Sequence, residues 1–565
     1  MKTLLVLLSF LFWDSVSFAY TPPAGIPDPG TWGTTHPIDT AAPDTATKCP
    51  AWPSGLVTGC YYIDSTAAGC DDDDAGTPDD PRCTLGDLTL AAGSYVEIHG
   101  GPYEITAGDD EYDWVFQGTA ESPVWVRGPS FASRPTISGL MMMSGSYAIV
   151  ENINFNRWSS ENKGRTGIGD GSAVVANHVA LRHCTFIGDG VFHTGFTAQI
   201  SIKGLTGNET NNIVLYDLDL RNFDSRTYAL ETAEDDDHAF LPGQYTNNIW
   251  ILDSTVNNIS GDAVQVTGNN AIGDARSQYV YIGGNDFSET GENAVDVKSS
   301  LDVVISENDF YIYDDGVGSD GTAIVIQQEG GTGSDNIWIL FNKIHSAYKA
   351  IRAEEVVTNM YVIGNLIYDQ YTVADSTHSD CAHFFGGGYV YFRTDTVSAS
   401  VIDNTFYNYQ GALGWDNEPT IAANGNLFYG RAQATGFDMC NGTDIGTSTY
   451  DYNLFDTGHQ YRVRMGANVY ETNAALISGE SKCTNCISGA ASISMPSFAL
   501  LGSSDAIDAN AGNSAYATFA TRYGVSIAKD YYGTTRPVNT IWDIGAYEYN
   551  EATAPQSRGT VLLGQ

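Results

Sequence analysis

A short motif that recurs along the middle of the chain constrains its fold more than any other feature. The motif reads apolar, any, apolar, any, any, Asn, any, then Phe or Ile, with clear copies at residues 280–287, 303–310 and 421–428. Eleven copies, some of them looser, end at the apolar residues Phe155, Phe186, Leu220, Val256, Phe287, Phe310, Ile344, Ile367, Phe406, Phe428 and Phe455. Neighbouring copies lie 22 to 39 residues apart, so a minimal repeat of 22 residues carries insertions of variable length.

The repeat has the chemistry of strands joined by tight turns. Alternating apolar residues indicate strands with one face turned inward. The recurrent Asn suits a turn that tolerates the left-handed backbone conformation, and its side chain can bond to the repeats above and below. A propeller needs a repeat of roughly 40 residues or more, and no 3.6-residue period supports a helical solenoid. The sequence therefore predicts an all-β fold, a right-handed parallel β-helix of about eleven stacked coils between residues 140 and 460.

The segments on either side of the repeat complete the expected layout. Residues 1–19 combine Lys2, an apolar run and small residues at the end, the pattern of a cleaved secretory signal. We expect residues 20–139 to form an N-terminal cap and the first coils. Residues 461–565 are expected to pack on the helix or to follow its last coil.

The charge and the cysteine content of the chain indicate its cellular location and limit the kinds of partner it can bind. The chain has 26 basic and 68 acidic residues, and this net charge of −42 makes nucleic acid an unsuitable partner. No later stretch is apolar enough to span a bilayer, so we expect an exported protein, extracellular or periplasmic, without membrane insertion. Nine cysteines in an exported chain favour disulfides, with Cys184 left over as a buried thiol. We expect the protein to be a monomer.

Segments flanking the repeat resemble a known superfamily. The stretches GTPDDPRCT (76–84), AGSYVEIHGGPY (92–103) and DYYGTTRPVNTIWDIGAYEY (530–549) are similar to segments of secreted bacterial proteins of the right-handed β-helix, pectate-lyase-like superfamily. In those proteins the earlier segments begin the helix and the last one lies after it. The resemblance covers most of the chain in architecture, and it says little about the reaction.

Aligning successive coils gives a candidate site. Residues at the same point of neighbouring coils are about 4.8 Å apart, so columns of side chains can be read from the repeat. The inward column is Val264, Val295, Ile324 and Ile351. The outward columns are Gln265, Asp296, Val325 and Arg352, and then Thr267, Lys298, Gln327 and Glu354. Turn positions beside them hold His238, Asp262, Asn293, Thr322 and Lys349.

This outward face has the mixed charge of a site. Only 26 residues of the chain are basic, yet Lys298, Lys349 and Arg352 fall on neighbouring coils of one face. Charges on a strand ladder also serve solubility or pair across coils, which is the alternative. His238 and Asp262 lie one coil apart, and a His beside a carboxylate is either an acid or base near neutral pH or a structural pair.

We predict a polysaccharide lyase that cleaves a uronic-acid-containing glycan by β-elimination. In the calcium-dependent β-helix lyases that the chain resembles, a Lys or Arg acts as base beside Asp-bound calcium. The resemblance implies Lys298 as the base and Asp262 and Asp296 as Ca²⁺ ligands. From the residues of the patch itself, we expect Asp236 and Asp237 to add Ca²⁺ ligands and Arg352 or His238 to complete the charge handling. The expected contacts to the glycan come from Asn293, Gln265, Gln327 and Lys349.

Three other functions use the same scaffold. A glycoside hydrolase would need two carboxylates about 5 to 9 Å apart, for which Asp262 and Asp296 are candidates. A uronate C5-epimerase shares the proton abstraction, but Ala233 stands where the β-helix mannuronan epimerases have a Tyr. A non-catalytic adhesin or glycan-binding β-helix would carry a uniform ladder instead of a groove with a basic cluster.

Overall fold

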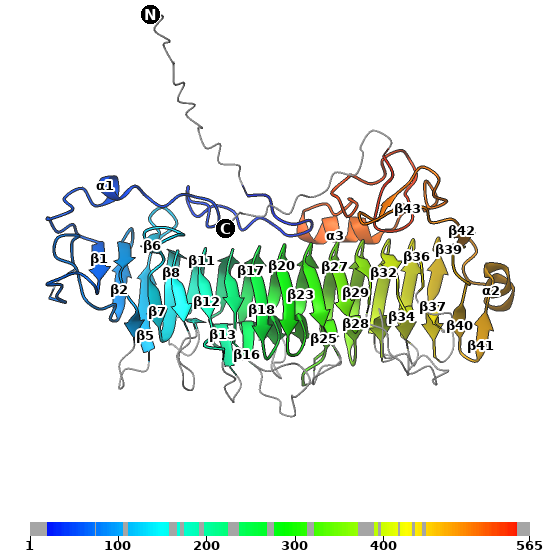
Figure 1. The fold of residues 1–565 in the computed structure, drawn as a ribbon, viewed down its shortest axis with the longest axis horizontal. Helices are drawn as coiled ribbons and strands as arrows, with labels where there is room; N and C mark the ends of the chain where they lie inside the picture. The colour runs from blue at the N-terminus through cyan, green and yellow to red at the C-terminus, as the bar shows by residue number, and fades with distance from the viewer. Residues whose placement is uncertain are drawn as a thin grey trace, which may run out of the picture.

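The structure is a computed structural model, in which the chain forms a long rod of stacked coils (Figure 1). It describes residues 20–550 except for 74, 105–110, 157–165, 170–174, 191–196, 224–236, 268–275, 314–320, 331, 371–388, 394–396, 416–418, 432–435 and 443–447. Each full coil contributes three strands, one to each of three parallel rows that run along the rod. The fold class is therefore confirmed as a parallel β-helix.

Rows A and B belong to one 28-stranded sheet and share the long strand β8 (Leu140–Glu151). Row A contains β2 (Leu88–Ala91), β5 (Glu111–Gln117), β8, β10 (Thr166–Ile168), β13 (Thr197–Ile202), β16 (Asp237–Pro242), β19 (Val264–Thr267), β22 (Val295–Lys298), β25 (Thr322–Gln327), β28 (Lys349–Ala353), β31 (Tyr389–Phe392), β34 (Gly411–Trp415), β37 (Phe437–Asn441) and β40 (Val463–Met465). Row B contains β1 (Cys60–Asp64), β3 (Tyr95–His99), β6 (Val124–Arg127), β8, β11 (Ala176–Arg182), β14 (Thr210–Tyr216), β17 (Thr246–Leu252), β20 (Gln278–Gly283), β23 (Leu301–Ser306), β26 (Ser334–Leu340), β29 (Val357–Ile363), β32 (Val397–Ile402), β35 (Thr420–Asn424) and β38 (Thr449–Asp451).

Row C is a separate 14-stranded sheet. It contains β4 (Tyr103–Glu104), β7 (Thr136–Ser138), β9 (Asn154–Asn156), β12 (Thr185–Ile187), β15 (Asp219–Arg221), β18 (Thr255–Ile259), β21 (Asp286–Thr290), β24 (Asp309–Tyr313), β27 (Lys343–Ala347), β30 (Leu366–Tyr368), β33 (Thr405–Tyr407), β36 (Leu427–Tyr429), β39 (Leu454–Asp456) and β42 (Ile487–Gly489). The remaining elements are β41 (Asn468–Tyr470), β43 (Ile493–Ser494), β44 (Ala499–Leu500), α1 (Thr45–Lys48), α2 (Asn473–Glu480) and α3 (Ala515–Tyr523).

The stack is longer than the motif alone predicts. Each of the eleven motif copies ends in a row C strand, and row C has three strands more, β4 and β7 before them and β42 after them. The motif is missing from β4 and β7, and in β42 the polar Ser488 stands in register with Phe455. Coils therefore also form outside residues 140–460, where no repeat marks them in the sequence.

The recurrent Asn forms a continuous buried ladder along the rod. Its members are Asn285, Asn308, Asn342, Asn365, Asn404, Asn426 and Asn453. In each of the first six, the side-chain Nδ2 donates to Oδ1 of the next Asn at 2.9 to 3.0 Å. The left-handed conformation belongs to the residue directly before each Asn, as in Glu307 (φ 56°) and Asp403 (φ 54°). The predicted bonding between coils is present, and the turn strain lies one residue earlier than the motif indicates.

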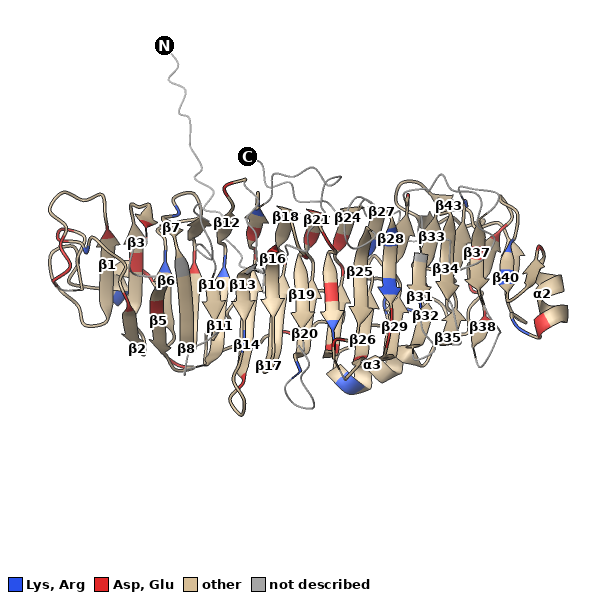
Figure 2. Ribbon diagram, turned by 90° about the horizontal axis from the view of Figure 1, so that it is seen from below, with Lys and Arg blue, Asp and Glu red and all other residues tan. Residues whose placement is uncertain are grey.

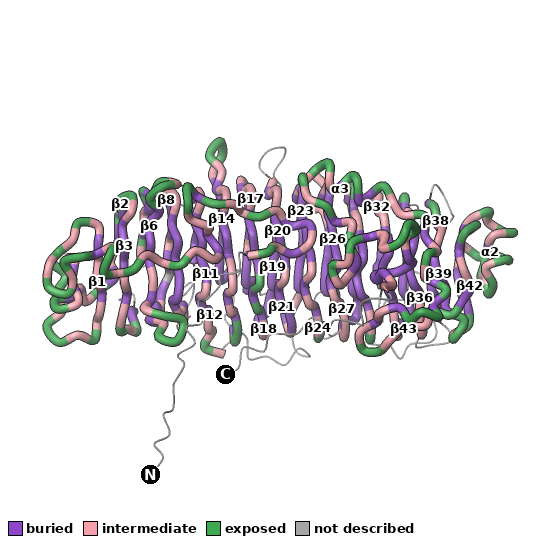
Figure 3. The backbone as a smooth tube through the Cα atoms, turned by 90° about the horizontal axis from the view of Figure 1, so that it is seen from above, coloured by how far each residue is buried: buried purple, intermediate pink, exposed green. Residues whose placement is uncertain are grey.

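Two segments cover the outer face of row B. Residues 20–42 run along the coils, and Trp250 Nε1 donates to the Pro27 carbonyl at 2.8 Å while Arg182 binds the Ile38 carbonyl at 2.7 Å. Helix α3 lies further along the same side, where Phe519 packs edge-on against Trp338 (Figure 1). Figure 3 shows the strands buried beneath these segments and exposure concentrated in turns and at the ends of the rod.

The cysteines are largely paired. Disulfides join Cys49 to Cys60, Cys70 to Cys83 and Cys483 to Cys486, and such bonds are typical of proteins outside the reducing cytosol. Cys184 is a buried free thiol, and burial raises its pKa to about 12, so it is unreactive as a nucleophile. Among the described residues, no helix has both the length and the apolar character needed to cross a membrane.

Candidate functional site

Strand register along row A confirms the predicted columns. Val264 pairs with Val295, Val295 with Ile324 and Ile324 with Ile351. The outward column is therefore Gln265, Asp296, Val325 and Arg352, and Lys298 lies between Thr267 and Gln327 in the next one. Figure 2 shows an acidic and a basic position on the strand between β19 and β25, which is β22, and a basic position on β28.

The first half of the site is built around Asp296. Lys298 Nζ lies 3.2 Å from Asp296 Oδ2, because alternate residues of β22 point to the same side. Gln327, one coil further on, donates its amide to both carboxylate oxygens at 2.9 and 3.0 Å. The Asp296 side chain is 4% exposed and that of Lys298 24%, so the lysine is the part of this pair that reaches solvent.

The second half is built around Asp262, which is fully buried. Asp262 Oδ1 accepts hydrogen bonds from both the backbone N–H and the side-chain amide of Asn293, at 2.9 and 3.0 Å. Gln265 Nε2 donates to Asp262 Oδ2 at 3.2 Å. Asn293 Oδ1 is buried and accepts no hydrogen bond from any residue that the structure describes. This oxygen is therefore a natural ligand for a cation or a hydroxyl group.

The pKa values of both carboxyl groups, Asp262 and Asp296, lie above that of an ordinary aspartate. Burial raises the pKa of Asp262 to about 6, although the nearby Lys298 charge lowers it. Burial raises the pKa of Asp296 to about 7, and the Asp262 carboxylate adds to that rise. For Lys298, burial alone would lower the pKa, but Asp296 and Asp262 together leave it above its ordinary value. The site therefore holds a protonated lysine beside two carboxyl groups that titrate near neutrality.

His238 occupies a buried position beside Asp262. Its ring is 0% exposed, and its Nδ1 accepts the backbone N–H of Asp262 at 2.9 Å while lying 3.3 Å from Asp262 Oδ2. A ring whose Nδ1 accepts a hydrogen bond carries its proton on Nε2 when neutral. This burial favours the structural alternative of the His–Asp pair over a ring in contact with a glycan.

Other predicted residues are spread more widely. Lys349 is 2% exposed, and its Nζ lies 5.9 Å from the centre of the Tyr348 ring. Arg352 Nη2 lies 3.5 Å from Glu354 Oε1, and Glu354 also pairs with Arg393 at 2.8 Å. Arg352 and Arg393 therefore continue the charged face toward the later coils, whereas Lys349 is enclosed.

The predicted metal ligands do not all meet. Asp236 lies outside the described residues. Asp237 is buried and accepts a hydrogen bond from Gln199 on the preceding coil at 2.7 Å. Within the described part of the chain, the acidic and His side chains whose ligand atoms lie within 4.8 Å of one another are His238, Asp262 and Glu292. Asp237 and Asp296 do not join that group, since their carboxylates are turned toward Gln199 and toward Gln327 and Lys298.

Sequence reasoning missed Glu292. It directly precedes Asn293 in the turn before β22, so its place beside Asp262 follows from the same coil alignment that selected Asn293. Asp262 and Glu292 bring together two carboxylates, which are oxygen ligands of the kind that Ca²⁺ prefers, and Asn293 next to Glu292 has a buried side-chain oxygen with no described partner. The nitrogen of His238 would suit a transition metal better.

Several solved structures are similar to this chain in fold, at low sequence identity. The chain is 12% identical to pectate lyase Pel9A, covering 87% of this chain and 96% of that one, with a TM-score of 0.33. The GH87 alpha-1,3-glucanase of Streptomyces thermodiastaticus strain HF3-3 is 12% identical over 75% of this chain and 72% of its own, with a TM-score of 0.42. The PL6 family alginate lyase AlyGC is 12% identical over 68% of this chain and 53% of its own, with a TM-score of 0.41. What they share with this chain is the fold alone. No protein-family model and no curated protein sequence matches the chain.

Proposed function

We propose that the protein is a polysaccharide lyase that cleaves a uronate-containing glycan by β-elimination. The observation that carries this proposal is the contact of Lys298 with Asp296 on the outer face of row A, one coil from Asp262. Elimination requires a cationic surface for the substrate carboxylate and a group that removes the proton from C5. Lys298 is the solvent-reaching cation of this cluster, and it stands on a rigid strand that fixes its direction.

A base role for Lys298 depends on its acidic neighbours. In the protein without a bound cation, Asp296 and Asp262 keep the pKa of Lys298 above its ordinary value, and an ammonium group cannot accept a proton. Neutralising the two carboxylates removes this stabilisation and leaves burial, which favours the neutral amine. Lys298 can therefore act as a base only in a site where the negative charge of these carboxylates is offset.

We propose that calcium neutralises Asp262 and that its positive charge lowers the pKa of Lys298, which offsets the effect of Asp296 beside the amine. Asp262 and Glu292 would hold it, with Asn293 Oδ1 as a further ligand. When bound, calcium would screen the carboxylates and attract the carboxylate of the glycan. Arg352, Gln327 and Gln265 line the columns on either side and would orient the neighbouring sugar units.

Calcium removal is expected to abolish activity. Treatment with EDTA should stop product formation, and added Ca²⁺ should restore it. Replacing Glu292 by Gln should weaken calcium binding at least tenfold by removing one charged ligand, while the same change at the exposed Glu471 should leave it unchanged. Isothermal titration calorimetry gives both affinities. Full activity in EDTA-treated protein would remove calcium from the proposal.

A glycoside hydrolase is the second candidate. Asp262 and Asp296 are buried carboxyl groups that influence one another, and burial raises the pKa of Asp262 to about 6 and that of Asp296 to about 7, so Asp296 takes up a proton more readily than Asp262. One protonated and one ionised carboxyl group form the acid and base pair of a hydrolase. In a hydrolase, Lys298 would only lower the pKa values of these two carboxyl groups.

One assay separates the two functions. The purified protein is incubated with pectate, alginate and other uronic polysaccharides, and the ultraviolet absorbance of an unsaturated uronate is followed together with reducing ends. A lyase produces both signals in step. Reducing ends without the absorbance would identify a hydrolase, and the absence of both signals would favour a non-catalytic glycan-binding protein.

A further inference from the structure

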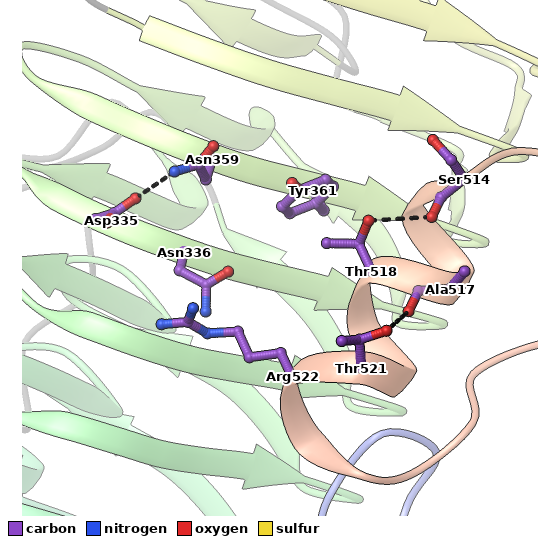
Figure 4. A pocket seen from close by; sticks show the side chains of 9 residues that line it. All are labelled: Asp335, Asn336, Asn359, Tyr361, Ser514, Ala517, Thr518, Thr521 and Arg522. Carbon is purple, nitrogen blue, oxygen red and sulfur yellow. Dashed lines mark hydrogen bonds between the residues drawn. The ribbon is translucent and has the colours of Figure 1, made fainter.

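A pocket lies between row B and α3, on strands other than those of the candidate site (Figure 4). Its volume is about 660 Å³, within the range of small-molecule sites. Strands β26 and β29 form the floor with Asp335, Asn336, Asn359 and Tyr361, and α3 forms the wall with Ser514, Ala517, Thr518, Thr521 and Arg522. None of these residues belongs to the candidate catalytic cluster.

An aromatic ring forms the centre of the pocket floor. Tyr361 is half-buried, and its ring stacks on Trp338 with 3.7 Å between centroids and 8° between planes. Trp338 and Tyr361 are in register on neighbouring strands, so the ring face of Tyr361 away from Trp338 is turned along the rod toward the next coil, where Ser400 is its register partner. Phe519 packs edge-on against Trp338 and fixes the stack. A fixed aromatic ring beside a small side chain is suited to the apolar face of a flat ring.

The polar groups of the pocket mostly accept hydrogen bonds. Thr518 donates its hydroxyl proton to the Ser514 carbonyl and Thr521 donates to the Ala517 carbonyl, which leaves oxygen lone pairs on both hydroxyls. Asp335 contributes a carboxylate, and Asn359 donates its amide to that carboxylate at 2.8 Å. A ligand rich in hydroxyl groups supplies the donors that such acceptors need.

Charge disfavours an acidic ligand here. Arg522 forms an ion pair with Asp302, in which Nη2 donates to Oδ2 at 2.7 Å and Nε donates to Oδ1. That ion pair neutralises Arg522, and Asp335 then leaves the pocket with a net negative charge. A uronate would add a carboxylate, which is repelled by Asp335 and offers no hydrogen-bond donor, whereas a neutral sugar has a hydroxyl group in its place.

We infer that this pocket binds a neutral saccharide unit, stacked on Tyr361 and hydrogen-bonded through its hydroxyls to Asp335, Thr518 and Thr521. The inference goes beyond the proposed lyase activity, because it gives the protein a separate contact to a neutral glycan. Such a contact would hold the enzyme on a composite polysaccharide while row A acts on its acidic part.

Affinity gel electrophoresis tests the inference with the intact protein. Its charge of −42 drives it through native gels that contain laminarin, xylan or galactomannan, and gels with alginate serve for comparison. Replacing Ala517 by Trp fills the pocket from an exposed position on α3 without disturbing the core, and Ala474→Trp on the exposed surface of α2 is the matched control.

The expected result is retardation of the wild-type protein by at least one neutral glycan. Ala517→Trp should reduce that affinity by about tenfold or more, and Ala474→Trp should leave it unchanged. Wild-type migration unaffected by all three neutral glycans would overturn the inference, as would equal retardation of Ala517→Trp. Activity of Ala517→Trp on a soluble uronic polysaccharide should equal that of the wild type, so failure of the lyase proposal is measured independently.

Discussion

Replacing Lys298 by Ala is expected to lower turnover of the uronic polysaccharide by about 10² to 10⁴-fold, the usual contribution of a positioned base. The side chain points outward and is 24% exposed, so its loss should leave the coil folded. The rate of ultraviolet product formation measures the effect, and circular dichroism checks the fold. Lys343→Ala is the matched control, because Lys343 pairs with Asp309 at 2.7 Å on row C, away from this cluster.

Lys298→Arg separates two roles for this side chain. Arginine keeps the positive charge, but its guanidinium has a much higher pKa than the lysine ammonium and its donor atoms lie elsewhere, so in a site built for Lys298 it can neutralise a carboxylate while being a far poorer proton acceptor. If Lys298 is the base, the Arg variant should be as inactive as the Ala variant. Recovery of most of the activity by Arg would show instead that the position supplies charge alone, and the base would then have to be another group.

Replacing Asn365 by Ala is expected to lower the free energy of unfolding by about 3 to 4 kcal/mol, since several buried groups lose their partners together. The Asn365 side chain donates to the Ile339 carbonyl at 2.9 Å and to Asn404 Oδ1 at 3.0 Å. It also accepts from the backbone N–H and the side-chain amide of Asn342, at 2.8 and 3.0 Å. Urea unfolding followed by tryptophan fluorescence measures the loss.

Asn485→Ala provides the comparison for the ladder. Asn485 is exposed, and its side-chain amide donates one hydrogen bond, to Asp451 Oδ2 at 2.7 Å. Surface substitutions of this kind usually change stability by less than about 0.5 kcal/mol. A similar loss in both variants would mean that the ladder contributes little beyond an ordinary surface hydrogen bond.

The sequence was sufficient for the periodic part of the site. Because alternate residues of a strand face opposite sides and each coil repeats the last, the alignment alone placed Asp296 and Arg352 in one outward column and Lys298 beside Gln327. The same regularity predicted the Asn ladder. These features depend on neighbours one coil away, and the motif marks that spacing directly in the sequence.

Features without a repeat in the sequence became visible only in the tertiary structure. Coil alignment brings Glu292 near Asp262, but the direction of its carboxylate in the turn before β22 is set by packing, because turns follow no alternation. The ion pair between Arg522 and Asp302 joins residues that are 220 positions apart in the sequence. Residues 20–42 and α3 likewise reach row B from the two ends of the chain. The sequence by itself determined the coil, its inward and outward faces and the columns of the candidate site. Only the tertiary structure decided which charged groups meet and where a second pocket forms, because those contacts depend on loops and terminal segments that no local period encodes.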